Sequence, residues 1–168
     1  MIRITSSKKN NELLDEITTL SKIRNALLND KIARKICKEK GMGEWFLAGV
    51  PIKFDEIKPS AKTVDSHIIL NKSLLKKSFD IIMRYVIHEL THSIQHVQNF
   101  RKKDTKKDKE DYLDKDTEVE AFKYQVEFDA ENRGEEKAEE YVEDLLDYHK
   151  LKGKDRADKK DELLDESH

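Results

Sequence analysis

Two histidines and a glutamate within five residues are the side chains best suited to chemistry in this sequence. His88, Glu89 and His92 form the pattern HExxH. Helix positions four apart project from one face about 40° apart, so both imidazoles can reach one Zn²⁺ at Zn–N distances of about 2.0 Å. Glu89 falls on the adjoining face, where a carboxylate can accept a proton from an activated water. The pattern therefore predicts zinc-assisted hydrolysis with Glu89 as the general base.

The residues around the pattern predict a helix from about 78 to 99 that lies between a core and a cleft. Its apolar residues form one stripe, and His88 and His92 point almost the opposite way. The stripe comprises Phe79, Ile82, Met83, Val86, Leu90, Ile94 and Val97. Two incidental histidines on a packed helix are the structural alternative. We expect instead that the second face holds a catalytic metal.

A catalytic zinc needs a third protein ligand. His96 continues the four-residue spacing, but in an unbroken helix it lies about 12 Å along the axis from His88. In the helical segment 118–128, Glu118 lies near the middle of the apolar arc, whereas Glu120 lies on the solvent side. A buried carboxylate needs a partner, so we favour Glu118 over Glu120 as the third ligand. A first-turn acid stabilised by the helix dipole is the alternative explanation of Glu118.

The rest of the chain predicts an α+β fold. Helical spacing covers 11–40, with a break near Asn29-Asp30, and returns over 117–132 and 135–150. Runs of β-branched and aromatic residues at 45–54 and 63–70 predict strands. We expect a small twisted sheet packed on the active-site helix, with further helices on both sides.

Length and composition indicate one domain with a small core. The chain has 168 residues, of which 40% are charged and 36% hydrophobic, against about 25% charged in a typical domain. We assign 1–153 to a single domain with an N-terminal helical region (1–41), a catalytic core (45–130) and a C-terminal helix (135–150). Residues 154–168 offer few apolar side chains, so we expect a charged, flexible tail.

Charge and cysteine content argue against several partners. The 33 Lys and Arg residues nearly balance the 35 Asp and Glu residues, so no overall field favours nucleic acid or an anionic membrane. The basic run 101–109 includes Asp104 and Asp108 and no aromatic residue, which favours a solvated loop over a nucleic-acid patch. Cys37 is the single cysteine, and we find no signal peptide or membrane span. We expect a cytoplasmic protein, and the sequence leaves its oligomeric state open.

Taken together, these residues resemble the zincin metallopeptidases, and within them the gluzincins. The third zinc ligand of gluzincins is a glutamate on a later helix, commonly in an E-x-E-A setting, which Glu118-Val119-Glu120-Ala121 matches. The likeness covers residues 45–130 and extends to small phage-associated and bacterial minimal zincins. It implies one Zn²⁺ per chain on His88, His92 and Glu118, Glu89 as the general base, and a protein or peptide substrate.

The resemblance also implies accessory features. Residues 68–70 would form the edge strand that pairs with an extended peptide, and Tyr112 or Tyr124 could stabilise the oxyanion. The sequence departs from the family at Tyr85, where zincins prefer Val or Thr, and at Phe122, where many gluzincins have Asp. The second departure leaves the support of His88 unassigned. The alternative function is a catalytically inactive zincin-like module that binds a protein or nucleic-acid partner.

Overall fold

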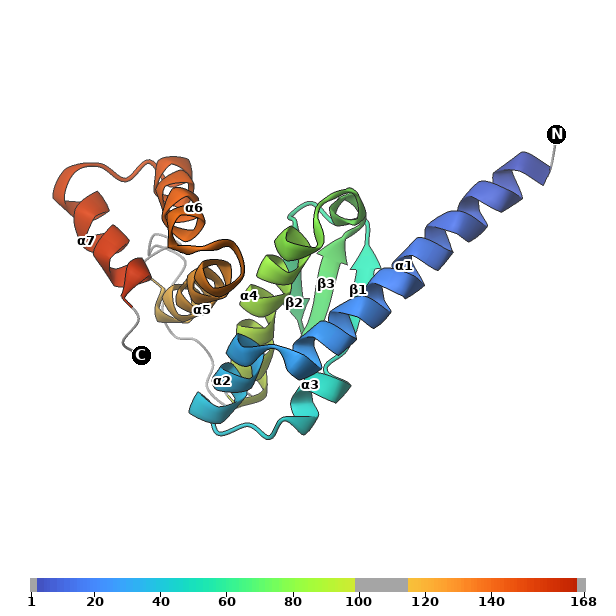
Figure 1. Cartoon of the computed structure of the whole chain (residues 1–168), viewed down its shortest axis with the longest axis horizontal. Helices are drawn as coiled ribbons and strands as arrows, with labels where there is room; N and C mark the ends of the chain where they lie inside the picture. The colour runs from blue at the N-terminus through green and yellow to red at the C-terminus, as the bar shows by residue number, and fades with distance from the viewer. Residues whose placement is uncertain (1–2, 99–114, 166–168) are drawn as a thin grey trace.

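The computed structural model describes residues 3–98 and 115–165 and has an α+β architecture (Figure 1). The elements are α1 (Arg3–Asn29), α2 (Lys31–Glu39), α3 (Trp45–Gly49), β1 (Ile52–Asp55), β2 (Ala61–Val64), β3 (His67–Asn71), the 3-10 helix η1 (Lys72–Lys76), α4 (Phe79–Gln98), α5 (Asp116–Arg133), α6 (Glu135–Tyr148) and α7 (Gly153–Leu164). The predicted helices over 78–99, 117–132 and 135–150 are confirmed as α4, α5 and α6. The basic run 101–109 and Tyr112 lie outside the described residues.

The three strands form one mixed sheet in the order β1-β3-β2. β3 runs parallel to β1 and antiparallel to β2. The prediction of a single strand over 63–70 was wrong, because Asp65 and Ser66 adopt φ values of 48° and 65° and turn the chain into a hairpin. The prediction that 68–70 form an edge strand was wrong for the same reason. β3 is the central strand, and β2 forms an edge beside α4.

The predicted strand over 45–54 is in fact a short helix followed by a strand. Trp45–Gly49 form α3, and only Ile52–Asp55 join the sheet. The guanidinium of Arg24 on α1 donates to the carbonyl oxygens of Leu47 and Val50 at 2.9 and 2.6 Å. A helix end leaves such carbonyls without backbone partners, so this contact from a distant residue stabilises α3 against the strand propensity of its sequence.

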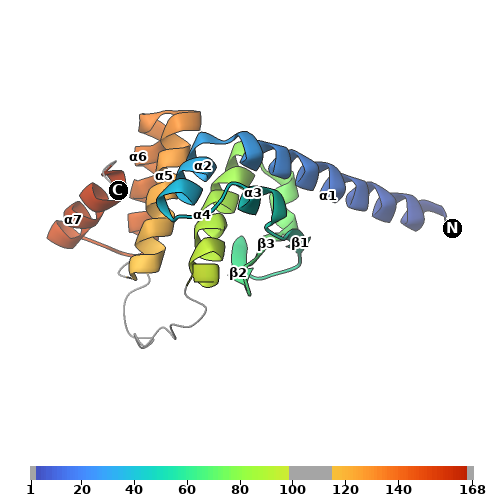
Figure 2. The same ribbon diagram turned by 90° about the horizontal axis from the view of Figure 1, so that it is seen from below.

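The first two helices meet at the predicted break. Asp30 caps α2 by accepting a hydrogen bond from the backbone N–H of Ala33 at 2.8 Å. The N-terminal half of α1 projects from the body in both views (Figures 1 and 2). Its residues Leu13, Leu14 and Ile17 are more than half exposed. The C-terminal half of α1 instead reaches the core through Ile23 and Leu27.

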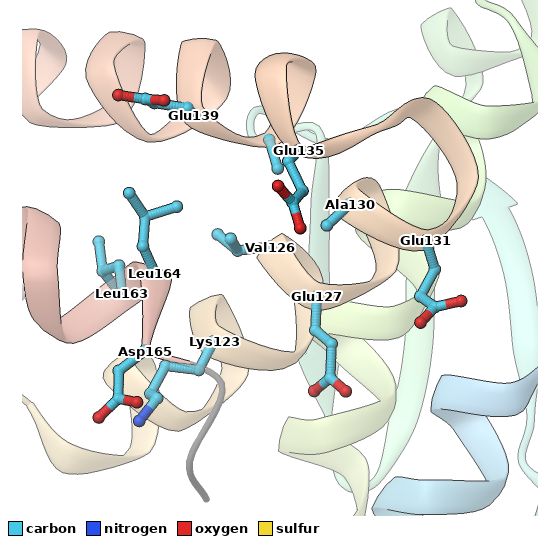
Figure 3. A pocket seen from close by; sticks show the side chains of 11 residues that line it. Lys123, Val126, Glu127, Ala130, Glu131, Glu135, Glu139, Leu163, Leu164 and Asp165 are labelled. Atoms are coloured by element: carbon cyan, nitrogen blue, oxygen red, sulfur yellow. The ribbon is translucent and has the colours of Figure 1, made fainter.

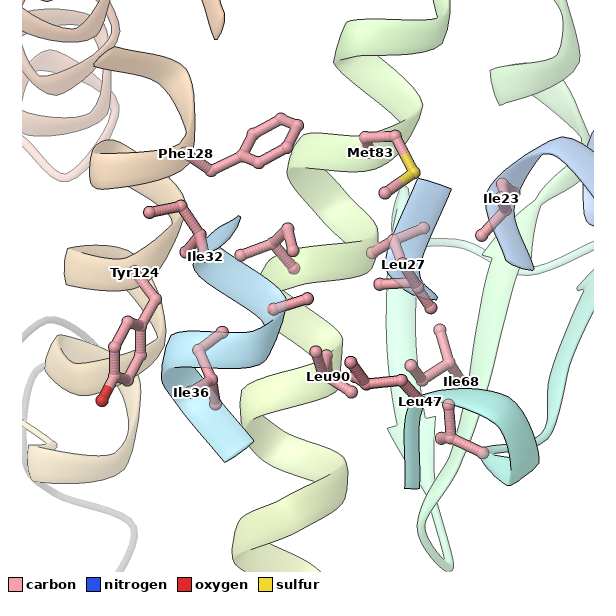
Figure 4. Packing of buried hydrophobic residues seen from close by; sticks show 14 of the residues in the cluster. Ile23, Leu27, Ile32, Ile36, Leu47, Ile68, Met83, Leu90, Tyr124 and Phe128 are labelled. Carbon is pink, nitrogen blue, oxygen red and sulfur yellow. The ribbon is translucent and has the colours of Figure 1, made fainter. Parts of the chain in front are cut away.

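α4 runs between the sheet and α5. Its buried Met83, Leu90 and neighbouring apolar residues pack with α1, α2, α3 and β3, and α5 adds Tyr124 and Phe128 (Figure 4). A second apolar cluster joins α5, α6 and α7. It consists of Phe122, Val126, Ala138, Val142, Leu146 and Leu163. α4 and α5 therefore meet between two cores.

Residues 153–164 form α7 rather than the flexible tail predicted from their composition. Leu163 is 1% exposed and belongs to the second apolar cluster. Arg156 contributes ion pairs to Glu143 and Asp147 on α6. One buried leucine and these ion pairs dock a helix whose other residues are mostly charged. None of the described helices is long and apolar enough to cross a membrane.

Candidate metal centre

α4 presents His88 and His92 to α5, on successive turns of the same face. Their side chains are 8% and 13% exposed, so the pair lies in the α4–α5 contact rather than at the wall of an open cleft. The ring of Phe122 on α5 packs edge-on against His88 at 4.5 Å between centroids. The middle of the opposite face is buried in the main core, as the sequence predicts, whereas Phe79 and Val97 at the ends of the predicted stripe are 37% and 44% exposed. Core packing therefore fixes the helix that orients both imidazoles.

Glu118 in the first turn of α5 completes the cluster. Its Oε2 lies 3.3 Å from His88 Nε2, and its Oε1 lies 3.1 Å from His92 Nε2. The two Nε2 atoms are 3.1 Å apart. Glu120 is directed elsewhere, to an ion pair with Lys40 at 2.8 Å. Of the two glutamates considered from the sequence, the structure brings Glu118 to the histidines.

The contacts between these atoms are as short as those between the ligands of a tetrahedral zinc ion. Ligands at about 2.0 Å from a tetrahedral ion lie about 3.3 Å from one another. The two Nε2 atoms are 3.1 Å apart, and they lie 3.3 and 3.1 Å from different oxygens of the Glu118 carboxylate. One ligand atom from each of the three residues lies within 4.8 Å of the other two. Among the described residues, this is the one group of histidine, cysteine or acidic side chains placed to hold a metal ion. Glu118 Oε2 is buried without a hydrogen-bond partner, and a buried carboxylate oxygen of this kind can bind a cation.

Hydrogen bonds at the other ring nitrogens set the direction of the lone pairs. His88 Nδ1 lies 2.8 Å from Gln125 Oε1, and His92 Nδ1 lies 2.8 Å from Gln95 Oε1. An amide oxygen only accepts, so each ring donates from Nδ1, and in its neutral form each ring directs the Nε2 lone pair into the cluster. Two imidazole lone pairs and a carboxylate this close repel one another unless a proton or a cation lies between them.

Burial and neighbouring charges act in opposite directions on the pKa values of Glu118 and His92. Burial raises the pKa of Glu118, but the adjacent imidazoles outweigh burial and hold that pKa well below its usual range. Burial lowers the pKa of His92, but the Glu118 carboxylate, with a smaller contribution from Glu89, raises it above its ordinary value. The buried carboxylate therefore favours a positive charge, carried by a proton or by a cation, between itself and the rings.

Glu89 lies close to this cluster and is held by the edge strand. It is 7% exposed, and its Oε2 accepts a hydrogen bond from the hydroxyl of Thr63 on β2 at 2.6 Å. It directly follows His88 on α4, and its charge contributes to the raised pKa of His92. A carboxylate held in this way can accept a proton, and the role of Glu89 as a general base stays a prediction.

The other residues considered from the sequence lie apart from the cluster. His96 is exposed on α4 and does not belong to it. The hydroxyl of Tyr124 donates to Glu39 on α2, and burial, reinforced by Glu39, raises the pKa of Tyr124. That hydroxyl is engaged outside the cluster, so the structure gives no support to Tyr124 as an oxyanion donor.

Gln95 and Gln125 are the residues of the site that sequence reasoning missed. Gln125 supplies the support of His88 that Phe122 left unassigned. A usable signal was present, because Gln125 shares the buried arc of α5 with Glu118. Gln95 follows His92 by three residues and therefore lies beside it on the same face of α4.

A groove of about 560 Å³ lies elsewhere, between α5, α6 and α7 (Figure 3). Its lining includes neither histidine of the cluster nor Glu118. Three of its carboxylates already pair with lysines. These pairs are Glu127 with Lys35, Glu131 with Lys31 and Glu139 with Lys160. The groove therefore adds no chemistry to the metal centre.

Comparisons with protein-family models, with curated proteins and with solved structures find no match. Function is therefore inferred from the geometry and chemistry of the site itself.

Proposed function

We propose that the protein is a zinc-dependent metallopeptidase with a zincin-like fold and one Zn²⁺ per chain. His88, His92 and Glu118 would hold the ion, and Glu89 would act as the general base. The proposal rests on one observation: the Nε2 atoms of His88 and His92 on α4 lie 3.1 Å apart, and each lies within 3.3 Å of an oxygen of the Glu118 carboxylate on α5. Two histidines with one glutamate form a ligand set typical of catalytic zinc, which keeps one position open.

When bound, zinc supplies a Lewis acid that polarises a peptide carbonyl and activates water at neutral pH. Glu89 accepts the proton of the attacking water and later delivers it to the leaving amine. The Thr63 hydroxyl fixes the Glu89 carboxylate during both transfers. β2 is an edge strand and contacts α4, so an extended peptide paired with β2 would pass the Glu89 carboxylate.

Peptide hydrolysis tests the proposal. Purified protein should cleave a mixture of fluorogenic peptides, lose activity with a chelator and regain it with zinc. Glu89→Gln should lower kcat/KM by about 10²–10⁴-fold and keep one zinc per chain, because Glu89 moves a proton and does not hold the ion. Glu131→Gln, a matched change on the exposed face of α5, should leave both readouts unchanged. Cleavage by Glu89→Gln at the wild-type rate would contradict this role.

The second candidate is a zincin-like module that binds zinc without catalysis and recognises a partner. The burial of the cluster favours it, since the three ligand side chains are only 8–13% exposed. Structural zinc sites are closed in this way, whereas catalytic sites admit substrate. Stoichiometric zinc without cleavage of any peptide would select this candidate over the hydrolase.

A further inference from the structure

The two histidines of the metal centre are supported by amides rather than by carboxylates. Gln125 Oε1 accepts from His88 Nδ1, and Gln95 Oε1 accepts from His92 Nδ1, both at 2.8 Å. Gln95 and Gln125 are 4% and 1% exposed, so water does not compete strongly for these bonds. The supporting group of a metal-binding histidine fixes its tautomer and ring orientation and alters its basicity.

Each glutamine side chain is held in place by the hydrogen bonds of its amide nitrogen. Gln95 Nε2 donates to the carbonyl of Thr117 at 3.1 Å and to Glu120 Oε2 at 2.7 Å. Two acceptors at that end establish which end of the amide is nitrogen. Gln95 thereby links α4 to the first turn of α5, the same turn that contains Glu118.

Gln125 is held by a different kind of acceptor, because its amide nitrogen donates to the Tyr141 hydroxyl of α6 at 2.7 Å. The Tyr141 ring lies beneath the guanidinium of Arg84, 4.3 Å from the ring centroid. Arg84 in turn pairs with Asp129 at 2.9 Å. A chain of contacts therefore fixes the oxygen of Gln125 against His88.

We infer that Gln95 and Gln125 are the positioning residues of this metal centre, which set its zinc affinity by holding both histidines with Nε2 facing Glu118. The inference depends on the proposed zinc site and not on peptidase activity. It predicts that a glutamate is tolerated at one of the two positions and not at the other. The hydroxyl beside Gln125 can rotate and donate, whereas the carbonyl and carboxylate beside Gln95 can only accept.

Zinc affinity, measured by competition with a chromophoric chelator, is the readout. Gln125→Leu and Gln95→Leu should each weaken zinc binding about 10–100-fold, the usual effect of losing such a partner. Both should also alter the visible spectrum of the Co²⁺-loaded protein, because the rings lose their fixed orientation. Gln98→Leu, an exposed residue near the end of the same helix, is the matched control and should bind zinc like the wild type.

Glutamate variants separate positioning from a general loss of packing. In Gln125→Glu the new carboxylate accepts from His88 and from Tyr141, so zinc should bind at least as tightly as to the wild type. In Gln95→Glu the new carboxylate meets Glu120 and the Thr117 carbonyl, so binding should weaken. This opposite response also tests the inference if the leucine variants fail to fold.

Each outcome identifies which idea fails. Wild-type zinc affinity in Gln125→Leu and Gln95→Leu, or equal weakening in both glutamate variants, would overturn the positioning role alone. A wild-type protein that binds zinc without cleaving peptides would overturn the hydrolase proposal and leave this inference intact. A wild-type protein that binds no zinc would overturn both.

Discussion

Zinc should stabilise the folded protein, because the Nε2 atoms of His88 and His92 lie 3.1 Å apart and each lies within 3.3 Å of the Glu118 carboxylate. The size of this stabilisation can be calculated from the zinc affinity. The ligands come from two helices, so the complete site exists only when α4 and α5 are docked. A ligand that binds only the folded state at 1,000 times its Kd adds about 4 kcal/mol to the free energy of unfolding. For a chain of this size that corresponds to a rise in Tm of about 12 °C.

Differential scanning fluorimetry with zinc or with a chelator measures this shift. The double variant His88→Ala/His92→Ala should show no zinc-dependent rise. His96→Ala should keep the full rise, because His96 is exposed on the same helix and lies outside the cluster. A rise of equal size in the double variant would refute the assignment of the site, and so would its loss in His96→Ala.

Three further predictions concern the fold and its charges. Leu90→Ala should lower the free energy of unfolding in urea by about 2–5 kcal/mol, because Leu90 is 0% exposed; a loss below 1 kcal/mol would contradict its place in the core. Arg84→Met should lower the free energy of unfolding by about 3–5 kcal/mol in the same assay, because it leaves the fully buried Asp129 without its main partner. An unchanged urea midpoint would exclude that role. In chelator-treated protein, the effect of the Glu118 carboxylate exceeds that of burial and raises the pKa of His92 above 6.5. The stability contributed by their pairing is therefore present below pH 6.5 and is lost as the pH rises through the raised pKa. The stability advantage of the wild type over Glu118→Gln should therefore shrink from pH 6 to pH 9, and a constant difference would show that His92 does not titrate against Glu118.

The parts of the site that follow helical periodicity could be predicted from the sequence. The spacing of His88 and His92 places both on the face of α4 opposite the core stripe. The position of Glu118 in the middle of an apolar arc distinguishes it from Glu120, which the structure pairs with Lys40. These inferences need only the geometry of one helix and the cost of burying a carboxylate.

The features that sequence reasoning missed depend on contacts between distant residues. α3 forms where Arg24 caps its carbonyls, against the local preference for a strand. The turn at Asp65-Ser66 lacks the glycine that usually marks a tight hairpin, so two strands appeared as one. α7 depends on Leu163 and on ion pairs to α6, which composition cannot reveal.

The burial of the site was also unexpected. The sequence predicts a face of α4 that borders a cleft, whereas the structure packs α5 against that face. The polar residues of the contact belong to two helices. In the sequence of each helix alone, the face that contains them appears exposed. Gln95 and Gln125 acquire their roles only when those helices meet.

The central claim is that one cation sits between two imidazoles and one carboxylate. A crystal of the zinc-loaded protein, with diffraction recorded on both sides of the zinc absorption edge, locates the ion without reference to activity. We predict a single anomalous peak per chain, about 2.0 Å from Nε2 of His88 and of His92 and in contact with Glu118. A peak at any other group of side chains, with these three residues left without metal, would contradict it.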